Sequence, residues 1–263
     1  MGEYDALILK NNAQLAEIAN QLSTVEVLPI NPVSPSVGQM WLYVNTDVLV
    51  DEFTGTDNAT WDTVKWRDDA KNAAATADTS KTDILSNKGR MSIQSTGGTA
   101  YIRKVTQNQV VDYSSAKKTL EFDVEDYKDT SYDNNMRIAV CSAVSAGDSY
   151  EEQNWIGIFF GVSAVIPGAH KGLLVQKGVN GSSSVLYAEE ITTGANTLHR
   201  YRFEFTTANN ISIQRWNGSE WVTLYSTATA GLLFSKGYVS ISCSTGTTSA
   251  PVKTRLIDNI KLK

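Results

Sequence analysis

The sequence predicts a mostly β chain: an antiparallel sandwich or barrel that follows a short N-terminal helix and a proline-rich neck. Short runs with alternating apolar residues recur from residue 51 to the C-terminus, and turn residues separate them at intervals of roughly 8–15 residues. No helical pattern alternates with these runs, which excludes a parallel α/β sheet. A chain of 263 residues has room for one such domain and an appendage.

Residues 1–25 predict an amphipathic helix that associates with other copies of the chain. Its apolar seam alternates spacings of four and three residues, which is a heptad pattern. The seam consists of Tyr4, Ile8, Asn11, Leu15, Ile18, Leu22 and Val25. The order of leucine and isoleucine favours three or four chains over two, and Asn11 fixes the register. We therefore expect a homotrimer or a tetramer, the alternative being a single helix that lies on a neighbouring domain.

Residues 26–50 predict a semi-rigid neck. Pro29, Pro32 and Pro35 recur every third residue, which forbids helix and favours an extended chain. Residues 40–44 alternate like a short strand, and a turn-like segment at residues 45–47 follows them. We expect this segment to connect the helix to the β domain.

Residues 51–263 predict the β domain. The run WIGIFFGVSAVI is apolar at nearly every position, which is typical of a central strand that is covered on both faces. In HRYRFEFTT, Tyr201, Phe203 and Phe205 share one face. Asn217-Gly218 predicts a hairpin. Only residues 68–82 interrupt the succession of strand-like runs and turns. They are either a helical turn or a surface loop.

Composition excludes several classes of function. The formal net charge of −5 and the lack of a basic stripe argue against nucleic-acid binding, and no run is apolar enough to cross a membrane. With only two histidines, a histidine metal site or a catalytic triad is hard to build.

Cys141 and Cys243 lie in strand-like runs, and we expect buried free thiols rather than a disulfide. The N-terminus has no Sec-type signal pattern.

Two resemblances extend this interpretation. Residues 51–57 with Trp61 and Trp66, residues 199–224 and residues 257–262 resemble concanavalin A-like, laminin G-like jelly-roll modules. That resemblance implies a jelly-roll sandwich over residues 51–263 whose first and last strands lie side by side. Separately, residues 32–43, PVSPSVGQMWLY, resemble a short segment that is common in bacteriophage fibre and structural proteins.

Together the resemblances imply a phage virion appendage, attached to the head or the tail. Its N-terminal segment would join copies of the chain and contact other virion proteins. Its lectin-like domain would face outward on the virion surface, where host-surface polysaccharide is a possible partner. Assembly would take place in the host cytoplasm, and a cellular carbohydrate-binding module is an alternative.

An enzymatic alternative rests on Glu121, Asp123 and Glu125. Alternate residues of a strand share a face, and retaining glycosidases need two carboxyl groups about 5–5.5 Å apart. The pattern resembles the catalytic strand of a jelly-roll glycanase family, which would make Glu121 the nucleophile and Glu125 the acid/base of a glycan depolymerase. An exposed acidic face opposite the apolar residues Leu120, Phe122 and Val124 explains the same alternation. We therefore expect no catalytic residues.

Two weaker patterns concern ligands. Acidic and amide side chains at Asp126, Asp129, Asp133, Asn134 and Asn135 are suitable for Ca²⁺, but they lack EF-hand spacing and also populate ordinary turns, so we expect no metal or cofactor. Four aromatic residues flank polar turns and are candidates for glycan stacking, although core packing would explain each of them. They are Trp155, Tyr187, Trp216 and Trp221.

Overall fold

The computed structural model describes eleven stretches of the chain: residues 49–71, 80–93, 100–125, 135–144, 152–162, 165–166, 171–180, 182–191, 198–227, 232–245 and 253–263. The predicted helix, the neck up to residue 48 and residues 126–134 of the calcium candidate lie outside them. Among the described residues no helix is long and apolar enough to cross a membrane.

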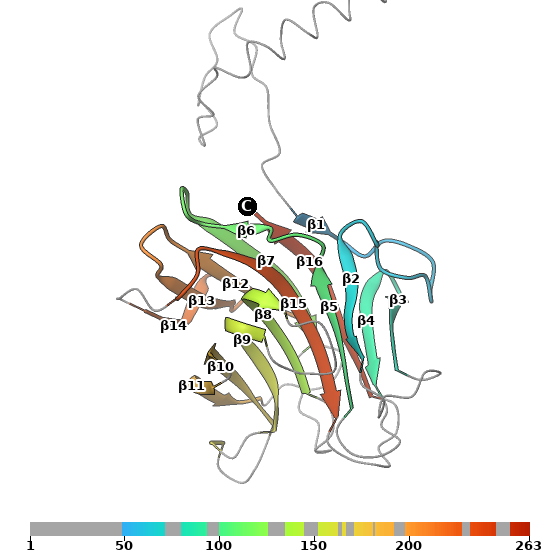
Figure 1. Ribbon diagram of the computed structural model, residues 1–263. Coiled ribbons are helices and arrows are strands. Elements are labelled where there is room, and N and C mark those ends of the chain that lie inside the picture. The colour runs from blue at the N-terminus through green and yellow to red at the C-terminus, as the bar shows by residue number, and fades with distance from the viewer. Residues whose placement is uncertain are drawn as a thin grey trace, which may run out of the picture. The chain divides into compact units, whose positions relative to one another are not determined.

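Two antiparallel eight-stranded sheets form the domain (Figure 1). The first, here the β7 sheet, runs in the order β14 (Trp221–Ser226), β13 (Ile211–Trp216), β12 (Leu198–Phe205), β7 (Lys118–Glu125), β16 (Lys253–Leu262), β4 (Lys88–Ile93), β3 (Lys81–Leu85). The short strand β1 (Leu49–Asp51) also pairs with β16.

The second sheet, here the β9 sheet, has the order β11 (Ser182–Glu190), β10 (Lys171–Val179), β9 (Glu152–Val162), β8 (Asn135–Val144), β15 (Lys236–Thr245), β5 (Ala100–Thr106), β2 (Trp66–Lys71). Strand β6 (Val111–Asp112) pairs with one end of β15. The mostly β, antiparallel two-sheet prediction is confirmed.

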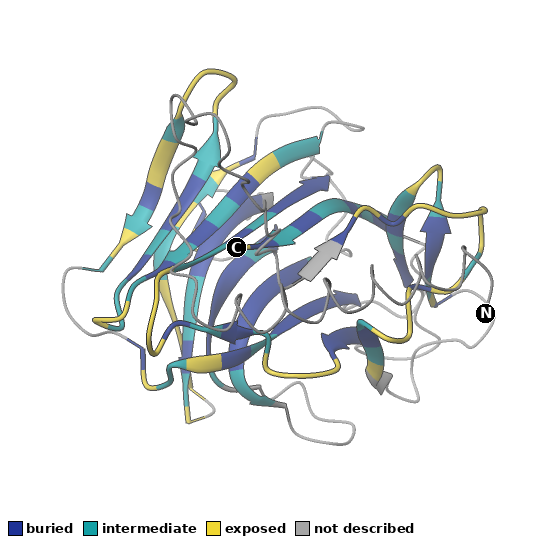
Figure 2. Ribbon diagram, turned by 90° about the horizontal axis from the view of Figure 1, so that it is seen from above, coloured by how far each residue is buried: buried dark blue, intermediate teal, exposed yellow. Residues whose placement is uncertain are grey.

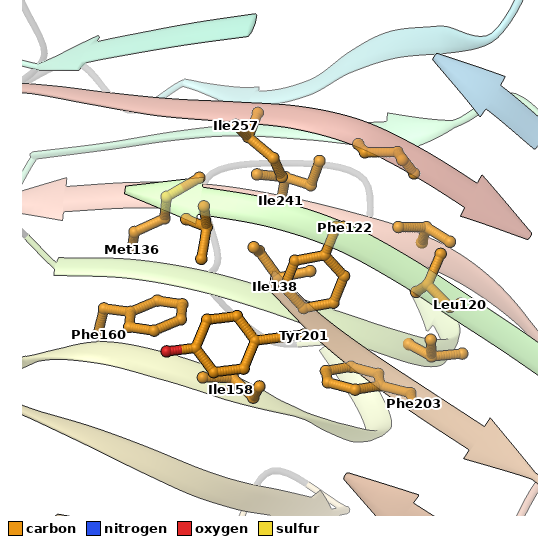
Figure 3. Close-up of a cluster of buried hydrophobic side chains, with 14 of the residues drawn as sticks. Leu120, Phe122, Met136, Ile138, Ile158, Phe160, Tyr201, Phe203, Ile241 and Ile257 are labelled. Atoms are coloured by element: carbon orange, nitrogen blue, oxygen red, sulfur yellow. The ribbon is translucent and has the colours of Figure 1, made fainter. Parts of the chain in front are cut away.

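The core lies between the inner faces of the two sheets. Figure 3 shows Phe122 of β7 with Tyr201 and Phe203 of β12, against Ile138 of β8 and Phe160 of β9. The ring centroids of Phe160 and Tyr201, from opposite sheets, are 5.5 Å apart in an edge-on arrangement. The alternating side chains Tyr201 and Phe203 of β12 therefore lie in the core, as the sequence of the strand predicts.

Strand β9 is covered on both faces, which confirms its predicted central place. It lies between β8 and β10, and residues 155–158 are all buried. Gly157 is required by close packing, because a Cβ there would lie 2.4 Å from the carbonyl oxygen of Ile138. Figure 2 shows the same trend across the domain: buried residues follow the central strands, and exposed residues gather at turns and edges.

The ends of the β domain meet, as the resemblance implied. Leu49 of β1 pairs with Leu262 of β16. The Asn217-Gly218 hairpin is also present, with Trp216 paired to Trp221 across the loop of residues 217–220. Of the ambiguous residues 68–82, both ends belong to strands, so the interruption is shorter than the sequence indicates.

The two cysteines lie on opposite faces of the β9 sheet. Cys243 belongs to the core, whereas Cys141 lies in a separate cluster with Ala139 and Trp155. Both are buried free thiols, as predicted. Their positions exclude a disulfide between them in this fold.

Candidate functional site

A polar cleft of about 730 Å³ lies where β11 ends, β12 begins and β13 turns into β14. This volume falls within the range of small-molecule sites. Charged, amide and aromatic side chains line most of it. The lining residues are Asp123, Glu189, Glu190, Ile191, Leu198, His199, Arg200, Arg215, Trp216, Asn217 and Gly218.

One ion pair on the β7 sheet forms part of the lining. Arg200 and Asp123 are directly opposite across β12 and β7. Arg200 Nε donates to Asp123 Oδ1 at 2.9 Å and Nη2 donates to Oδ2 at 3.3 Å, while Asn259 Nδ2 donates to Oδ2 at 2.8 Å. The hydrogen bond to Asp123 is the main cause that raises the pKa of Arg200. The pair is therefore a fixed, charged part of the cleft.

Asn259 reaches Asp123 because β16 is bulged. The register of β16 against β7 shifts between Asp258 and Lys261, and Asn259 adopts a φ of 51°. Asparagine tolerates this left-handed conformation better than most residues. The bulge thus turns the Asn259 amide toward the Asp123 carboxylate. A regular strand would not place an amide there.

A second ion pair joins the two sheets. Arg215 Nη1 of β13 donates to Glu189 Oε1 of β11, and the hydroxyl of Tyr187 donates to Glu189 Oε2 at 2.6 Å. Burial, followed by the hydrogen bond to Glu189, raises the pKa of Tyr187 to about 12. Tyr187 therefore keeps its proton and holds Glu189 in place at neutral pH.

His199 also lines the cleft, near the Arg215–Glu189 pair. Burial is the main cause that lowers the pKa of His199 below its ordinary value, and the charge of Arg215 lowers it further. His199 is thus neutral at pH 7. With both guanidinium groups paired to carboxylates, the cleft offers ordered donors and acceptors.

Trp216 supplies an aromatic wall. Its ring packs edge-on against Trp221, with centroids 5.5 Å apart, and the Arg202 guanidinium lies 4.3 Å from the centroid of the Trp221 ring. Trp221, which is itself covered by the Arg202 guanidinium, thus supports the Trp216 ring through its edge-on contact. Beside it, Asn217 and Gly218 of the hairpin loop present polar groups at the cleft.

The three acidic residues of the glycanase-like pattern lie along β7. Asp123 is engaged as described, and Lys263 Nζ lies 3.7 Å from Glu121 Oε2. Asp123 and Glu125 are only 7 % and 6 % exposed, so the prediction of an exposed acidic face is wrong for these two residues. Arg200 and Asn259 bind the Asp123 carboxylate, and the carbonyl oxygen of Glu125 accepts a hydrogen bond from the buried Arg255. Only Asp123 lines the cleft.

Comparison with solved structures identifies the fold. A β-glucanase of Bacillus licheniformis superposes with a TM-score of 0.54 at 13% identity, over 82% of this chain and 97% of that chain. The carbohydrate recognition domain of Emp46p in its potassium-bound form gives 0.52 at 12% identity, over 75% and 88%. The domain has a concanavalin A-like jelly-roll fold. The LamA catalytic domain of Zobellia galactanivorans is similar as well, with a TM-score of 0.54 at 11% identity over 83% and 97%.

No protein-family model and no curated protein matches the sequence. At such low identities the structural similarity establishes the concanavalin A-like fold alone. The bacteriophage origin and the coiled coil stay predictions from the sequence.

The four aromatic candidates of the sequence have different environments. Trp216 lines the cleft, Tyr187 holds Glu189 at its edge, and Trp221 packs behind Trp216. Trp155 lies elsewhere and is 6 % exposed, with the Arg137 guanidinium 4.4 Å from its ring centroid. Its burial makes Trp155 a packing residue in this fold, not an open platform for a sugar.

The polar half of the cleft could not be found from the sequence. Asp123 and Arg200 are 77 residues apart, and Glu189 and Arg215 are 26 apart. Alternation along β12 indicates that Arg200 faces outward, but no local pattern gives its partner.

Among the described residues, no group of three or more histidine, cysteine or acidic side chains could hold a metal ion.

Proposed function

We propose that this chain is a non-enzymatic component of a bacteriophage virion whose concanavalin A-like domain binds host-surface glycans at the cleft. One observation carries the glycan proposal: the supported Trp216 ring stands beside two ion pairs that are fixed by their own hydrogen bonds. The N-terminal segment would join three copies and attach them to the particle.

The chemistry of the cleft is suitable for sugars. The apolar face of a pyranose ring stacks on an indole, while its hydroxyls exchange hydrogen bonds with planar carboxylate, guanidinium and amide groups. Because the charges are paired in the protein, their geometry does not have to reorganise when a sugar binds. The fold supports the same class of ligand, since it is shared with a carbohydrate recognition domain and with glucanases.

The arrangement of carboxylates favours binding over hydrolysis. A glycosidase needs one carboxyl group as acid and a second as nucleophile or base on either side of the scissile bond. Three carboxylates line the cleft: Asp123, Glu189 and the exposed Glu190. Asp123 and Glu189 each accept hydrogen bonds from an arginine and from a further side chain, which occupy their oxygens, so neither is available to act with Glu190 as an acid–nucleophile pair. Glu121 and Glu125 do not line the cleft.

A glycan array tests the binding proposal. The full chain should bind a subset of host-surface polysaccharides, and Trp216→Ala should lose about tenfold in affinity, or about 1.4 kcal/mol. Trp216→Phe keeps an aromatic face and should retain most of the binding, whereas Val64→Ala, at a residue that is 83% exposed outside the cleft, should change nothing. Equal binding by wild type and Trp216→Ala would place the glycan site elsewhere.

A reducing-sugar assay on the polysaccharide that binds distinguishes glycan binding from the glycan-depolymerase alternative. Wild type and Glu121→Gln should both release no new reducing ends. Release by wild type that Glu121→Gln abolishes would establish the alternative instead.

The trimer and virion parts of the proposal rest on the heptad seam and on residues 32–43. Light scattering of the intact chain at micromolar concentration should give three times the monomer mass, and a monomer would refute the trimer. Antibody labelling of particles should place the chain at the virion surface. Absence from particles would favour a cellular carbohydrate-binding module.

A further inference from the structure

The two sheets end in four edge strands of unequal character: β3 and β2 on one side of the described sandwich, β14 and β11 on the other (Figure 1). An open edge exposes unpaired backbone N–H and C=O groups, which attract a further strand unless charges or a covering segment prevent it. The four strands differ in which of these protections they carry.

The β3 and β2 edges are protected. Asn58 N donates to the carbonyl of Ile84 at 2.8 Å, and Ile84 N donates to the carbonyl of Ala59 at 2.8 Å, so a neighbouring segment already pairs with β3. Strand β2 has the sequence WRDDAK, in which four of six residues are charged. A second strand is disfavoured on this side.

Strand β14 and the first half of β11 carry neither protection among the described residues. Strand β14 has the sequence WVTLYS, and the first half of β11, residues 182–185, is SSSV. Val185 and Val222 are 39 % and 38 % exposed. Both strands lie on the same side, where β11 contacts β14, and the Glu189–Arg215 pair joins β11 to β13, the neighbour of β14.

Each of these strands contains one bulge, which limits the length that a partner can pair. The register shifts place Leu186 of β11 and Leu224 of β14 outside the regular pairing, and both side chains turn toward the core. Regular edge remains at residues 182–185 and 221–223. An edge of three or four residues gives only a few hydrogen bonds, which is too little for an independent dimer.

We propose that the two uncharged edge segments, residues 182–185 and 221–223, form the contact between copies of the chain, with β11 of one copy beside β14 of the next. A strand is the complement of an open edge, and neither edge segment carries a charge that would repel the other. A head-to-tail contact of this kind gives a closed ring when the rotation between copies closes, and the proposed trimer requires that closure. The inference rests on the proposed trimer, because the N-terminal tether raises the effective concentration of the neighbouring edge to about the millimolar range.

Disulfide trapping in the full chain tests the contact. Oxidation of the double variant Ser183→Cys with Thr223→Cys should give covalent dimers and trimers on a non-reducing gel. The control pairs Ser183→Cys with Asp68→Cys, on the β2 edge, where the Asp68 side chain is 81% exposed, and should stay monomeric. The native thiols, Cys141 and Cys243, are buried and do not interfere.

A second readout does not depend on the register of the contact. In the full chain, the amides of residues 182–185 and 221–223 should exchange hydrogen at least tenfold faster in Val185→Lys with Val222→Lys than in wild type, while β3 is unchanged. A trimeric chain that gives no intermolecular cross-link and no change in exchange overturns this interface alone. A wild-type monomer by light scattering overturns both the trimer and the interface.

Discussion

Asp51 joins three parts of the chain near the start of the sandwich. Its Oδ1 accepts a hydrogen bond from Phe53 N at 3.0 Å, and its Oδ2 accepts one from Trp66 Nε1 at 2.6 Å. Lys65 Nζ lies 3.9 Å from Oδ1. Phe53, held at a φ of 47°, then packs on Trp61 with ring centroids 4.7 Å apart. One buried carboxylate thus fixes a strained turn and two aromatic rings.

Asp51→Ala should lower the free energy of unfolding by about 2 kcal/mol, because it leaves the buried Trp66 N–H without its acceptor. Urea unfolding that is followed by tryptophan fluorescence measures the effect. Glu220→Ala, at an exposed hairpin residue, should change stability by less than about 0.5 kcal/mol. Equal effects of the two substitutions would refute the role given to Asp51.

His199 predicts a pH dependence of stability. Its pKa is lowered in the folded chain, so the unfolded chain binds the proton more readily. The free energy of unfolding should therefore fall as the pH drops below about 6.5. Urea midpoints between pH 7 and pH 5 should show a smaller fall in His199→Gln than in wild type. Identical slopes in the two proteins would contradict this assignment.

At the scale of elements, the β13–β14 hairpin is held by hydrogen bonds within its own loop. Asn217 Oδ1 accepts hydrogen bonds from Ser219 N and Glu220 N, both at 2.9 Å, and from Ser219 Oγ at 3.0 Å. Gly218 follows at a φ of 104°, which side-chain-bearing residues rarely adopt. The two residues together set the turn that carries Trp216 and Trp221.

Asn217→Ala should reduce stability by about 1 kcal/mol, because the loop amides lose a common acceptor. In a domain of this size that corresponds to about 2–4 °C in the melting temperature. Asn217→Asp keeps an acceptor and should melt close to wild type. A melting temperature for Asn217→Ala equal to that of wild type would show that the glycine alone shapes the loop.

Local patterns were sufficient to predict the strands but not their irregularities. Alternation in HRYRFEFTT and the apolar run of β9 predict which faces are buried, because side-chain period is a property of the strand itself. The bulges at Leu186, Leu224 and Asn259 depend on the register of a neighbouring strand. Of the strands that bear these bulges, β11 lines the cleft and β16 sends Asn259 to Asp123, so the polar half of the cleft appears only in three dimensions.

The whole molecule combines a well-packed sandwich with a small polar site at one end. The core of aromatic and aliphatic residues gives the fold its rigidity, whereas the cleft is formed by residues from β7, β11, β12 and β13 that alternate outward or lie at strand ends. Composition and strand spacing predicted the sandwich, and the jelly-roll resemblance agrees with the observed concanavalin A-like fold. The glycan site could be predicted only as a set of aromatic residues, of which Trp216 lines the cleft.

The central claim is that the cleft beside Trp216 binds glycans without cleaving them. Isothermal titration calorimetry of the full chain with its best array glycan measures this most directly. We expect saturable binding whose dissociation constant rises about tenfold in Trp216→Ala and changes little in Trp216→Phe. An unchanged dissociation constant in Trp216→Ala, or a continuing heat signal from hydrolysis of the glycan, would contradict the account.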